Sequence, residues 1–267
     1  MSLTTTVARM VRDKLAAWPT APDQNVLYDL LRLLGRWRSV MMANTYMAHQ
    51  GAKIWGGPFA GMEYVTEATE GALIPRLLGT YESELHPHLA AFAAEGLDCL
   101  IDVGCAEGYY AVGVARMMPD VTVYAYDIDE RARNSCAELA AKNGVSDRVI
   151  IGGEFKPDGF EAFAGRRALV MVDAEGAELE ILQPALSPAL AGLSVIVETH
   201  DVYRAGAMAE IVRRFEPTHQ IEIVRQAPKT FDAPPWFDDL THLDQLLAVW
   251  EWRARPTPWL VMRPKGS

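Results

Sequence analysis

Two kinds of hydrophobic pattern divide the chain near Asp98. Beyond this residue, short apolar and β-branched runs alternate with stretches of helical spacing, which is typical of βαβ units and of a parallel sheet covered on both faces. The runs predict seven strands, at residues 99–103, 121–127, 148–152, 168–173, 194–199, 220–224 and 259–262. Between them, the pattern predicts helices over residues 109–118, 130–143, 177–185 and 205–215. The expected fold is therefore a doubly wound α/β domain with a mostly parallel sheet.

The pattern changes on both sides of this alternation. Residues 1–97 have a mainly helical pattern, with expected helices at 4–18, 25–35 and 74–94 around a glycine-rich stretch at 56–58. We expect residues 1–97 to form a helical N-terminal cap or lid over the domain at residues 98–267. A proline-rich insertion at residues 226–257, with one expected helix at 240–252, precedes the last strand. A last strand reached without a regular crossover helix can run antiparallel to its neighbours.

The clearest motif spans residues 100–110, where an apolar strand carrying Asp102 leads into a turn bounded by Gly104 and Gly108. The glycines let the backbone bend sharply, and the N–H groups of the following helix suit the carboxylate of a bound amino-acid moiety. A turn with the spacing Gly-x-x-x-Gly is less suited to binding a pyrophosphate than the Gly-x-Gly-x-x-Gly turn of dinucleotide-binding folds. Asp102 would also repel a pyrophosphate, whereas it can meet a positively charged amino group. An ordinary strand-turn-helix corner is the structural alternative.

A second acid stands at the tip of the second predicted strand. Asp127 can accept hydrogen bonds from both ribose hydroxyls of an adenosine ligand. Ile128 is then expected on the adenine face, and Glu154, after the third strand, near the adenine amino group, although Glu154 equally fits a solvated loop acid. Asp129 fits better as the first acid of the next helix, where it favours the helix dipole.

Further polar residues follow the fourth and fifth predicted strands. Asp173, Glu198 and His200 are expected along one rim, because ligands bind at the carboxyl ends of the strands in open α/β sheets. His200 can accept the proton of an acceptor hydroxyl, but it fits an exposed loop position equally well. Together with Asp201 these groups offer ligands for a divalent metal, yet they lack the spacing of a metal motif, so we assign none. Trp236, in the insertion, is a candidate substrate contact or a member of a local apolar core.

Residues 101–110 together with residues 172–178 resemble the FkbM-type methyltransferase family, whose members pair such a first-strand turn with an Asp-Val-Glu-Gly-Ala-Glu motif. This chain has Ala174 where valine is usual, and Ala106 and Glu107 where asparagine and a hydrophobic residue are common. The likeness covers about residues 79–199, and residues 77–85 resemble a lead-in that could close over the cofactor.

The resemblance implies a class I, Rossmann-like fold of seven strands and an enzyme that uses S-adenosylmethionine. Taken with the motifs above, the expected cofactor contacts are Asp102, Gly104, Cys105, Gly108, Tyr109, Asp127, Ile128, Glu154 and Asp173. We expect O-methylation of a small-molecule or saccharide-type acceptor, with His200 or Asp173 as the proton acceptor and with Glu198 and Trp236 near the substrate. An NAD-dependent oxidoreductase and a non-catalytic cofactor-binding protein are the alternatives.

Composition narrows the expected partners and location. The 267 residues carry 25 lysines and arginines against 35 aspartates and glutamates, a net charge of -10, which argues against nucleic-acid binding. The cysteines, Cys99, Cys105 and Cys136, lack the spacing of a disulfide framework or zinc site, so a reducing cytoplasm is expected. Charges in the N-terminal segment favour neither a signal peptide nor a membrane anchor. The composition is compatible with either a monomer or a homo-oligomer.

Overall fold

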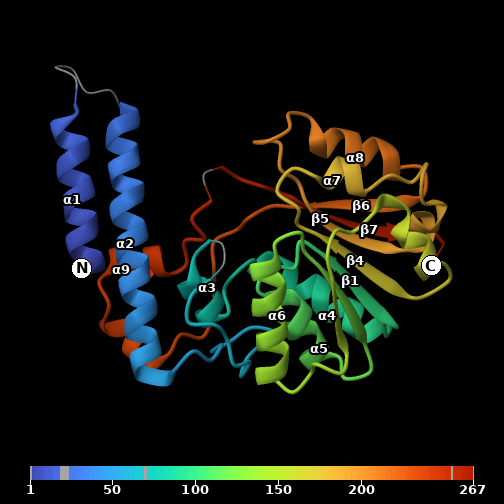
Figure 1. The fold of residues 1–267 in the computed structure, drawn as a ribbon, viewed down its shortest axis with the longest axis horizontal. Helices are drawn as coiled ribbons and strands as arrows, with labels where there is room; N and C mark the ends of the chain where they lie inside the picture. Colours follow the sequence, from blue (N-terminus) through green and yellow to red (C-terminus); the bar gives the residue numbers. More distant parts are fainter. Residues whose placement is uncertain (1, 19–23, 69–70, 254, 267) are drawn as a thin grey trace.

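The computed structural model describes residues 2–18, 24–68, 71–253 and 255–266. Its centre is a seven-stranded sheet with the order β3-β2-β1-β4-β5-β7-β6 (Figure 1). The strands are β1 (Cys99–Val103), β2 (Thr122–Tyr126), β3 (Val149–Gly152), β4 (Ala168–Val172), β5 (Ser194–Glu198), β6 (His219–Val224) and β7 (Trp259–Pro264). The neighbouring pairs among β1 to β5 are parallel, and β7 pairs antiparallel with both β5 and β6. This is the class I methyltransferase arrangement, and the expected antiparallel last strand is confirmed.

Burial explains why these segments form strands. All five residues of β1 and all five of β4 are buried, as their nearly unbroken apolar sequences predict for strands covered on both faces. The edge strand β6 instead exposes polar residues, among them Gln220 and Glu222. Polar side chains on an edge strand oppose pairing with another chain.

Helices cover both faces of the sheet. One face carries α4 (His86–Glu95), α5 (Tyr109–Met117) and α6 (Glu130–Lys142), and the other carries α7 (Glu178–Ile181) and α8 (Ala207–Phe215) (Figure 1). Two separate clusters of buried apolar side chains correspond to these two layers. The alternating pattern therefore predicted the layers correctly, although α7 is much shorter than the expected helix at residues 177–185.

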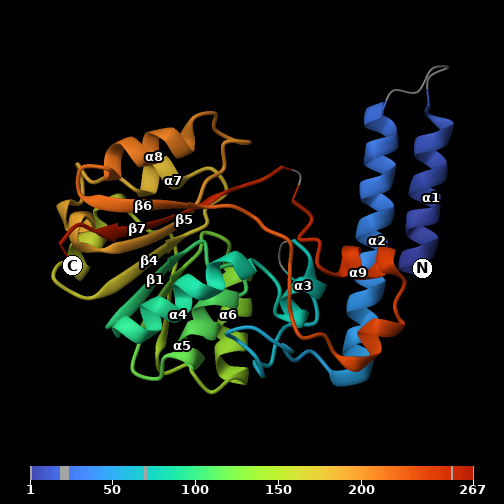
Figure 2. The same cartoon turned by 180° about the vertical axis from the view of Figure 1, so that it is seen from behind.

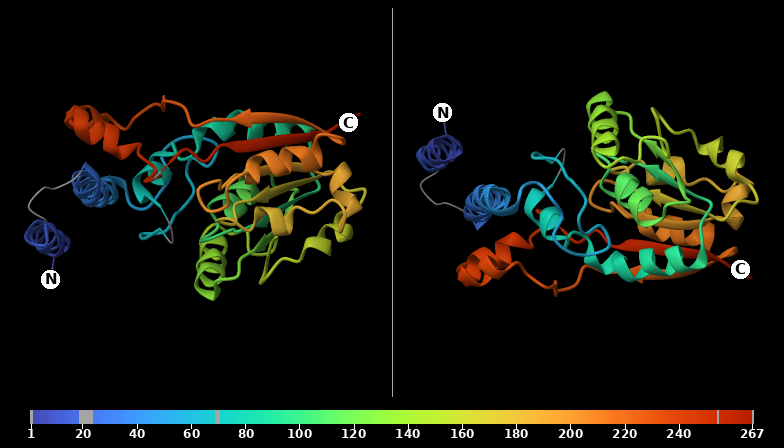
Figure 3. Two further views of the ribbon diagram at one scale, coloured as in Figure 1. Left: turned by 90° about the horizontal axis from the view of Figure 1, so that it is seen from above. Right: turned by 90° about the horizontal axis from the view of Figure 1, so that it is seen from below.

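An antiparallel helical hairpin lies beside the α/β body (Figure 2). It consists of α1 (Leu3–Ala16) and α2 (Gln24–Gln50), and α2 continues well beyond the expected end at residue 35. The insertion returns to this hairpin and packs α9 (His242–Ala248) across α2 (Figure 3). Arg38 of α2 binds both carboxylate oxygens of Asp244 in α9, at 2.6 and 2.7 Å. Among the described helices, none has both the length and the apolar character needed to cross a membrane.

The single helix expected at residues 74–94 is broken into α3 (Leu73–Leu78), a 3-10 turn (Ser83–Leu85) and α4. The break occurs at Gly79, which caps the C-terminal end of α3 in a left-handed backbone conformation with a φ of 75°. A Cβ atom on Gly79 would lie 2.0 Å from the carbonyl oxygen of Gly56. The glycine-rich stretch and Gly79 therefore permit a close backbone approach between segments distant in sequence, which no local pattern reveals.

Candidate functional site

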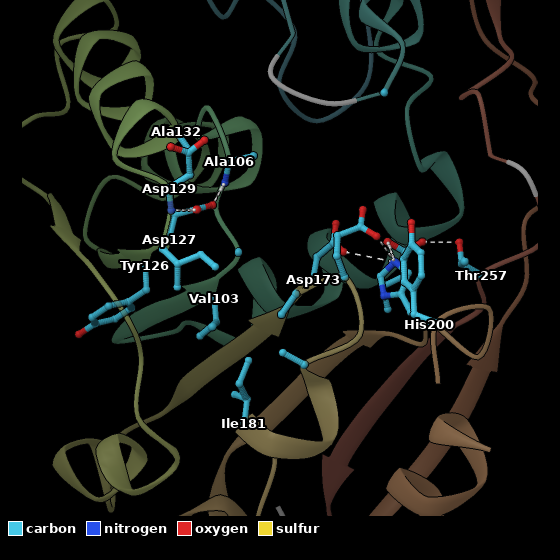
Figure 4. Close-up of a pocket in the computed structure, with 18 of the residues that line it drawn as sticks. Val103, Ala106, Tyr126, Asp127, Asp129, Ala132, Asp173, Ile181, His200 and Thr257 are labelled. Atoms are coloured by element: carbon cyan, nitrogen blue, oxygen red, sulfur yellow. Dashed lines mark hydrogen bonds and ion pairs between the residues drawn. The ribbon is translucent and has the colours of Figure 1, made fainter. Parts of the chain in front are cut away.

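A cavity of about 1060 Å³ opens at the carboxyl ends of β1 to β5 (Figure 4). Residues that follow these strands form one wall, and the opposite wall comes from α2 and from residues 251–253, 255 and 257. The volume is sufficient for a nucleoside-sized cofactor together with a small second molecule. Its position is where open α/β sheets bind their ligands.

The turn after β1 forms the floor of this cavity. Gly104 has a φ of 88°, and a Cβ atom there would lie 1.8 Å from the carbonyl oxygen of Asp173. The N–H groups of Gly104 and Cys105 donate to the carbonyl of Tyr126, at 2.8 and 3.0 Å. The turn is thus held between the tips of β2 and β4, and only glycine fits at residue 104.

Asp127 lies beside this turn with its carboxylate fixed by the backbone. One oxygen, Oδ2, accepts the N–H of Ala106 at 2.9 Å, and Oδ1 accepts the N–H of Asp129 at 2.8 Å (Figure 4). Each carboxylate oxygen can accept a further hydrogen bond, so Asp127 is oriented to receive two neighbouring hydroxyls. Asp129 caps α6 by accepting the N–H of Arg131 at 2.9 Å, which agrees with its interpretation as a helix-start acid.

The other expected cofactor residues fall into two groups. Gly104, Ile128, Glu154 and Asp173 line the cavity with Asp127. Ile128 is 81% exposed, and Glu154 is exposed and pairs with Lys156 at 2.6 Å.

The second group lies beneath the turn rather than in the cavity lining. It comprises Asp102, Cys105, Gly108 and Tyr109. Tyr109 packs edge-on against Phe59, Tyr64 and Tyr81. Asp102 is 3% exposed, and its Oδ2 has no hydrogen-bond partner among the described residues. Burial, followed by the charge of Asp127, raises the pKa of Asp102 to about 7.

His200 lies across the cavity from Asp127 (Figure 4). It is only 3% exposed, so it is not an exposed loop histidine. Its Nδ1 lies 2.6 Å from Oε1 of the fully buried Glu178, which also accepts the N–H of Gly176 at 2.9 Å. Glu178 lies in the first turn of α7, where an acid favours the helix dipole, and its contact with His200 gives it a second role.

The free nitrogen of His200, Nε2, faces carboxylates. It lies 3.8 Å from Oδ1 of Asp173, 3.4 Å from Oε2 of Glu175 and 3.6 Å from Oε2 of Glu198. Burial lowers the pKa of His200, but the hydrogen bond to Glu178 and the nearby carboxylate charges outweigh it, so this pKa lies above 6.5. Burial and the charge of Glu198 raise the pKa of Asp173 well above its usual value. The expected rim of Asp173, Glu198 and His200 is therefore present as one interacting group.

A buried ion-pair network closes the cavity behind this rim. Arg253 contacts Glu82 and Glu198, and its Nε lies 3.1 Å from Glu251. Lys229 binds Glu251 at 2.7 Å and Glu84 at 2.6 Å. Burial raises the pKa of Glu82, and the charges of Glu198 and Glu251 add to this rise against the opposing charge of Arg253. The network joins the lead-in segment, the tip of β5 and the insertion.

Sequence reasoning missed most of this network. It noted residues 77–85 as a possible closing segment but assigned nothing to Glu82, Glu251 or Arg253. Arg253 and Glu82 are 171 residues apart, so no motif could connect them.

Residues with strained backbone conformations cluster around the same cavity. Among the described residues, four non-glycine residues have a positive φ: Glu82, Ala106 and Glu175, each at 47°, and Trp252 at 65°. Three of the four line the cavity, and Glu82 belongs to the ion-pair network behind it. Such conformations are costly and concentrate at functional sites, so they support the assignment of this cavity as the site.

Ligand atoms of Asp173, Glu175 and His200 all lie within 4.8 Å of one another, which is close enough to share a cation. Binding a metal ion and accepting a proton both require the neutral imidazole with a free Nε2, so His200 cannot do both at once.

Two further sequence candidates lie away from the cavity lining. Trp236 stacks on His49 at 5.2 Å and meets Tyr46 edge-on at 6.0 Å, so it packs between the insertion and α2. Asp201 accepts the N–H groups of Gly206 and Met208 and thereby holds the start of α8.

No family model matches the chain, and no curated protein matches it by sequence. The resemblance to FkbM-type enzymes is therefore not confirmed.

Solved structures are similar in fold. The O-methyltransferase TomG from Streptomyces achromogenes, in complex with SAM, is 14% identical with a TM-score of 0.46, covering 85% of this chain and 90% of that chain. An O-methyltransferase from Bacillus cereus, in complex with SAH, is 11% identical with a TM-score of 0.47 and the same coverage of 85% and 90%. The human methyltransferase 10 domain containing protein is 10% identical with a TM-score of 0.49, covering 86% and 97%.

Proposed function

We propose that this protein is an S-adenosylmethionine-dependent methyltransferase that methylates a hydroxyl group of a small molecule. The observation that carries the proposal is the pairing of two groups across one cavity. Asp127 is oriented by two backbone N–H groups on one side, and His200 is oriented by the buried Glu178 on the other. The first suits a ribose, and the second suits removal of a proton.

The residues present fit this cofactor. The ribose hydroxyls would meet Asp127, with adenine over Ile128 and towards Glu154, and the amino-acid portion would lie along the turn at Gly104. The unpartnered oxygen of Asp102 beneath this turn and the close approach of Gly104 to Asp173 are consistent with a ligand seated directly on the backbone. Carboxylates along the cavity favour a ligand that carries positive charge.

The same carboxylates weigh against the NAD alternative. A dinucleotide would bring a pyrophosphate over the turn, where Asp102 lies below and Asp173 beside it. The turn also lacks the middle glycine of the dinucleotide fingerprint. We therefore do not favour an oxidoreductase.

His200 acts as the base in the proposed reaction. S-adenosylmethionine supplies an electrophilic methyl group on a positively charged sulfur. Nε2 of His200 is placed to accept the proton of the acceptor hydroxyl, whose oxygen would take the methyl group while S-adenosylhomocysteine would leave. Glu178 holds the Nδ1 side and stabilises the imidazolium that forms. We assign His200 to proton transfer rather than to metal binding.

The motif at residues 172–178 supports the further proposal that the enzyme is FkbM-type. Its first acid, Asp173, lines the cavity beside His200, and its last acid, Glu178, contacts the same imidazole. The remaining acid, Glu175, lies 3.4 Å from Nε2 of His200, so all three acids of the motif surround one imidazole.

Calorimetric titration with S-adenosylmethionine, S-adenosylhomocysteine and NAD tests the cofactor assignment. We expect the first two to bind and NAD not to bind. In Asp127→Asn, the affinity for S-adenosylhomocysteine should fall about 100-fold, because two charge-assisted hydrogen bonds weaken. Asp120→Asn is the matched control, because Asp120 is exposed and lies outside the cavity lining. Unchanged affinity in Asp127→Asn, or preference for NAD, would overturn the assignment.

A further inference from the structure

The wall of the cavity opposite the strand ends is basic. Arg32 and Arg36 of α2 line it together with Arg255. Within the described part of the chain, none of these three arginines has a carboxylate at ion-pair distance. Arg38, half a turn beyond Arg36, does not line the cavity and is neutralised by Asp244. The unpaired charges on α2 are therefore the ones that face the cavity.

Trp252 holds two of these charges close together. Nη2 of Arg32 donates to its carbonyl oxygen at 3.5 Å, and the guanidinium of Arg36 lies over its ring, 5.4 Å from the centroid. Burial and the charge of Arg32 lower the pKa of Arg36, as expected for like charges in proximity. Trp252 itself has a φ of 65°, which is unusual for a large side chain. The chain thus maintains a strained backbone and two repelling cations at this position.

The charge of this wall is opposite to that of the rest of the molecule. The protein has a net charge of -10, and the strand-end wall carries Asp127, Asp173 and Glu198. A cation and an anion can therefore bind at opposite sides of the same cavity. Guanidinium groups recognise phosphate and carboxylate through paired N–H donors. Three arginines on a concave wall suit one such group on a small molecule rather than the repeating charges of a nucleic acid.

We infer that the methyl acceptor carries an oxyanion, a phosphate or a carboxylate, which Arg32, Arg36 and Arg255 bind while its hydroxyl faces His200. This inference rests on the proposed methyltransferase function. The cofactor's own carboxylate is expected at the turn between β1 and α5, on the strand-end wall. The three arginines are therefore left for the second substrate.

Calorimetry with simple anions tests this wall directly. Protein saturated with S-adenosylhomocysteine is titrated with inorganic pyrophosphate and, separately, with citrate, so that phosphate and carboxylate recognition are distinguished. We use Arg36→Met, which keeps the aliphatic stem over Trp252, and Arg255→Met. Arg12→Met is the control, because Arg12 is an exposed arginine of α1 outside the cavity lining. At least one anion should bind, and either cavity variant should weaken it about tenfold.

The outcomes separate this inference from the proposed function. Loss of S-adenosylhomocysteine affinity in Arg36→Met would place the arginines in the cofactor site and overturn the inference. Binding of neither anion, or equal binding by Arg36→Met, Arg255→Met and the parent, would also overturn it. Failure of the parent to bind S-adenosylhomocysteine would instead contradict the methyltransferase proposal, whatever the anion titrations show.

Discussion

The two walls of the cavity are built in different ways. The strand-end wall is fixed by main-chain geometry: Gly104 contacts the backbone of Asp173, and the carboxylate of Asp127 accepts two backbone N–H groups. The opposite wall is formed by long side chains, among them Arg32 and Arg36, that project from a helix beside the α/β body. The strand-end wall follows from the sheet topology, whereas the opposite wall depends on the α1–α2 hairpin beside the sheet.

This difference separates two functions. A site made by strand tips tolerates little variation, which suits a cofactor of fixed structure. A site made by side chains on an added hairpin can change without disturbing the sheet, which suits an acceptor that differs between enzymes. Changes to one wall should therefore leave binding at the other wall nearly unaffected.

The largest effect expected within this comparison is on turnover. His200→Gln removes the proposed base, so the rate of S-adenosylhomocysteine formation should fall about 100-fold or more, with cofactor affinity nearly unchanged. The assay uses an acceptor identified by screening hydroxylated phosphates and carboxylates. His242→Gln is the control, because His242 is exposed on α9 outside the cavity lining. Full activity in His200→Gln would show that acceptor deprotonation does not require this histidine.

A smaller effect is expected on the pH dependence of activity. Because the pKa of His200 lies above 6.5, the base is protonated at low pH, and activity should rise as pH increases through that pKa. Glu178→Gln removes the carboxylate whose hydrogen bond and charge help to raise this pKa but keeps a polar partner, so the rising limb should move to lower pH. Glu138→Gln, at an exposed site on α6, should not move it. A profile that is identical in Glu178→Gln and the parent would contradict the positioning role of Glu178.

The sequence was informative where structure follows from local pattern. The seven strands lie within one or two residues of their predicted positions, because fully buried strands such as β1 and β4 are continuous apolar runs. The strand-tip residues Asp173, Glu198 and His200 could also be placed on one rim, because parallel strands end at a common edge.

The rest depended on contacts between distant segments. The contact of Gly79 with Gly56 breaks the expected helix at residues 74–94, and Arg253 reaches Glu82 across 171 residues. The arginine wall was missed for the same reason, since Arg36 meets Trp252 only when the insertion returns to α2. The sequence left Trp236 as either a substrate contact or a member of a local apolar core, and its packing against His49 agrees with the second alternative.

The division of the cavity into a cofactor wall and an acceptor wall is tested most directly by a crystal structure with S-adenosylhomocysteine bound. The account predicts that both ribose hydroxyls contact Asp127, that the amino-acid portion follows the turn at Gly104, and that Arg32 and Arg36 make no contact with the ligand. A ligand carboxylate bound by Arg32 and Arg36, or a ribose away from Asp127, would contradict it.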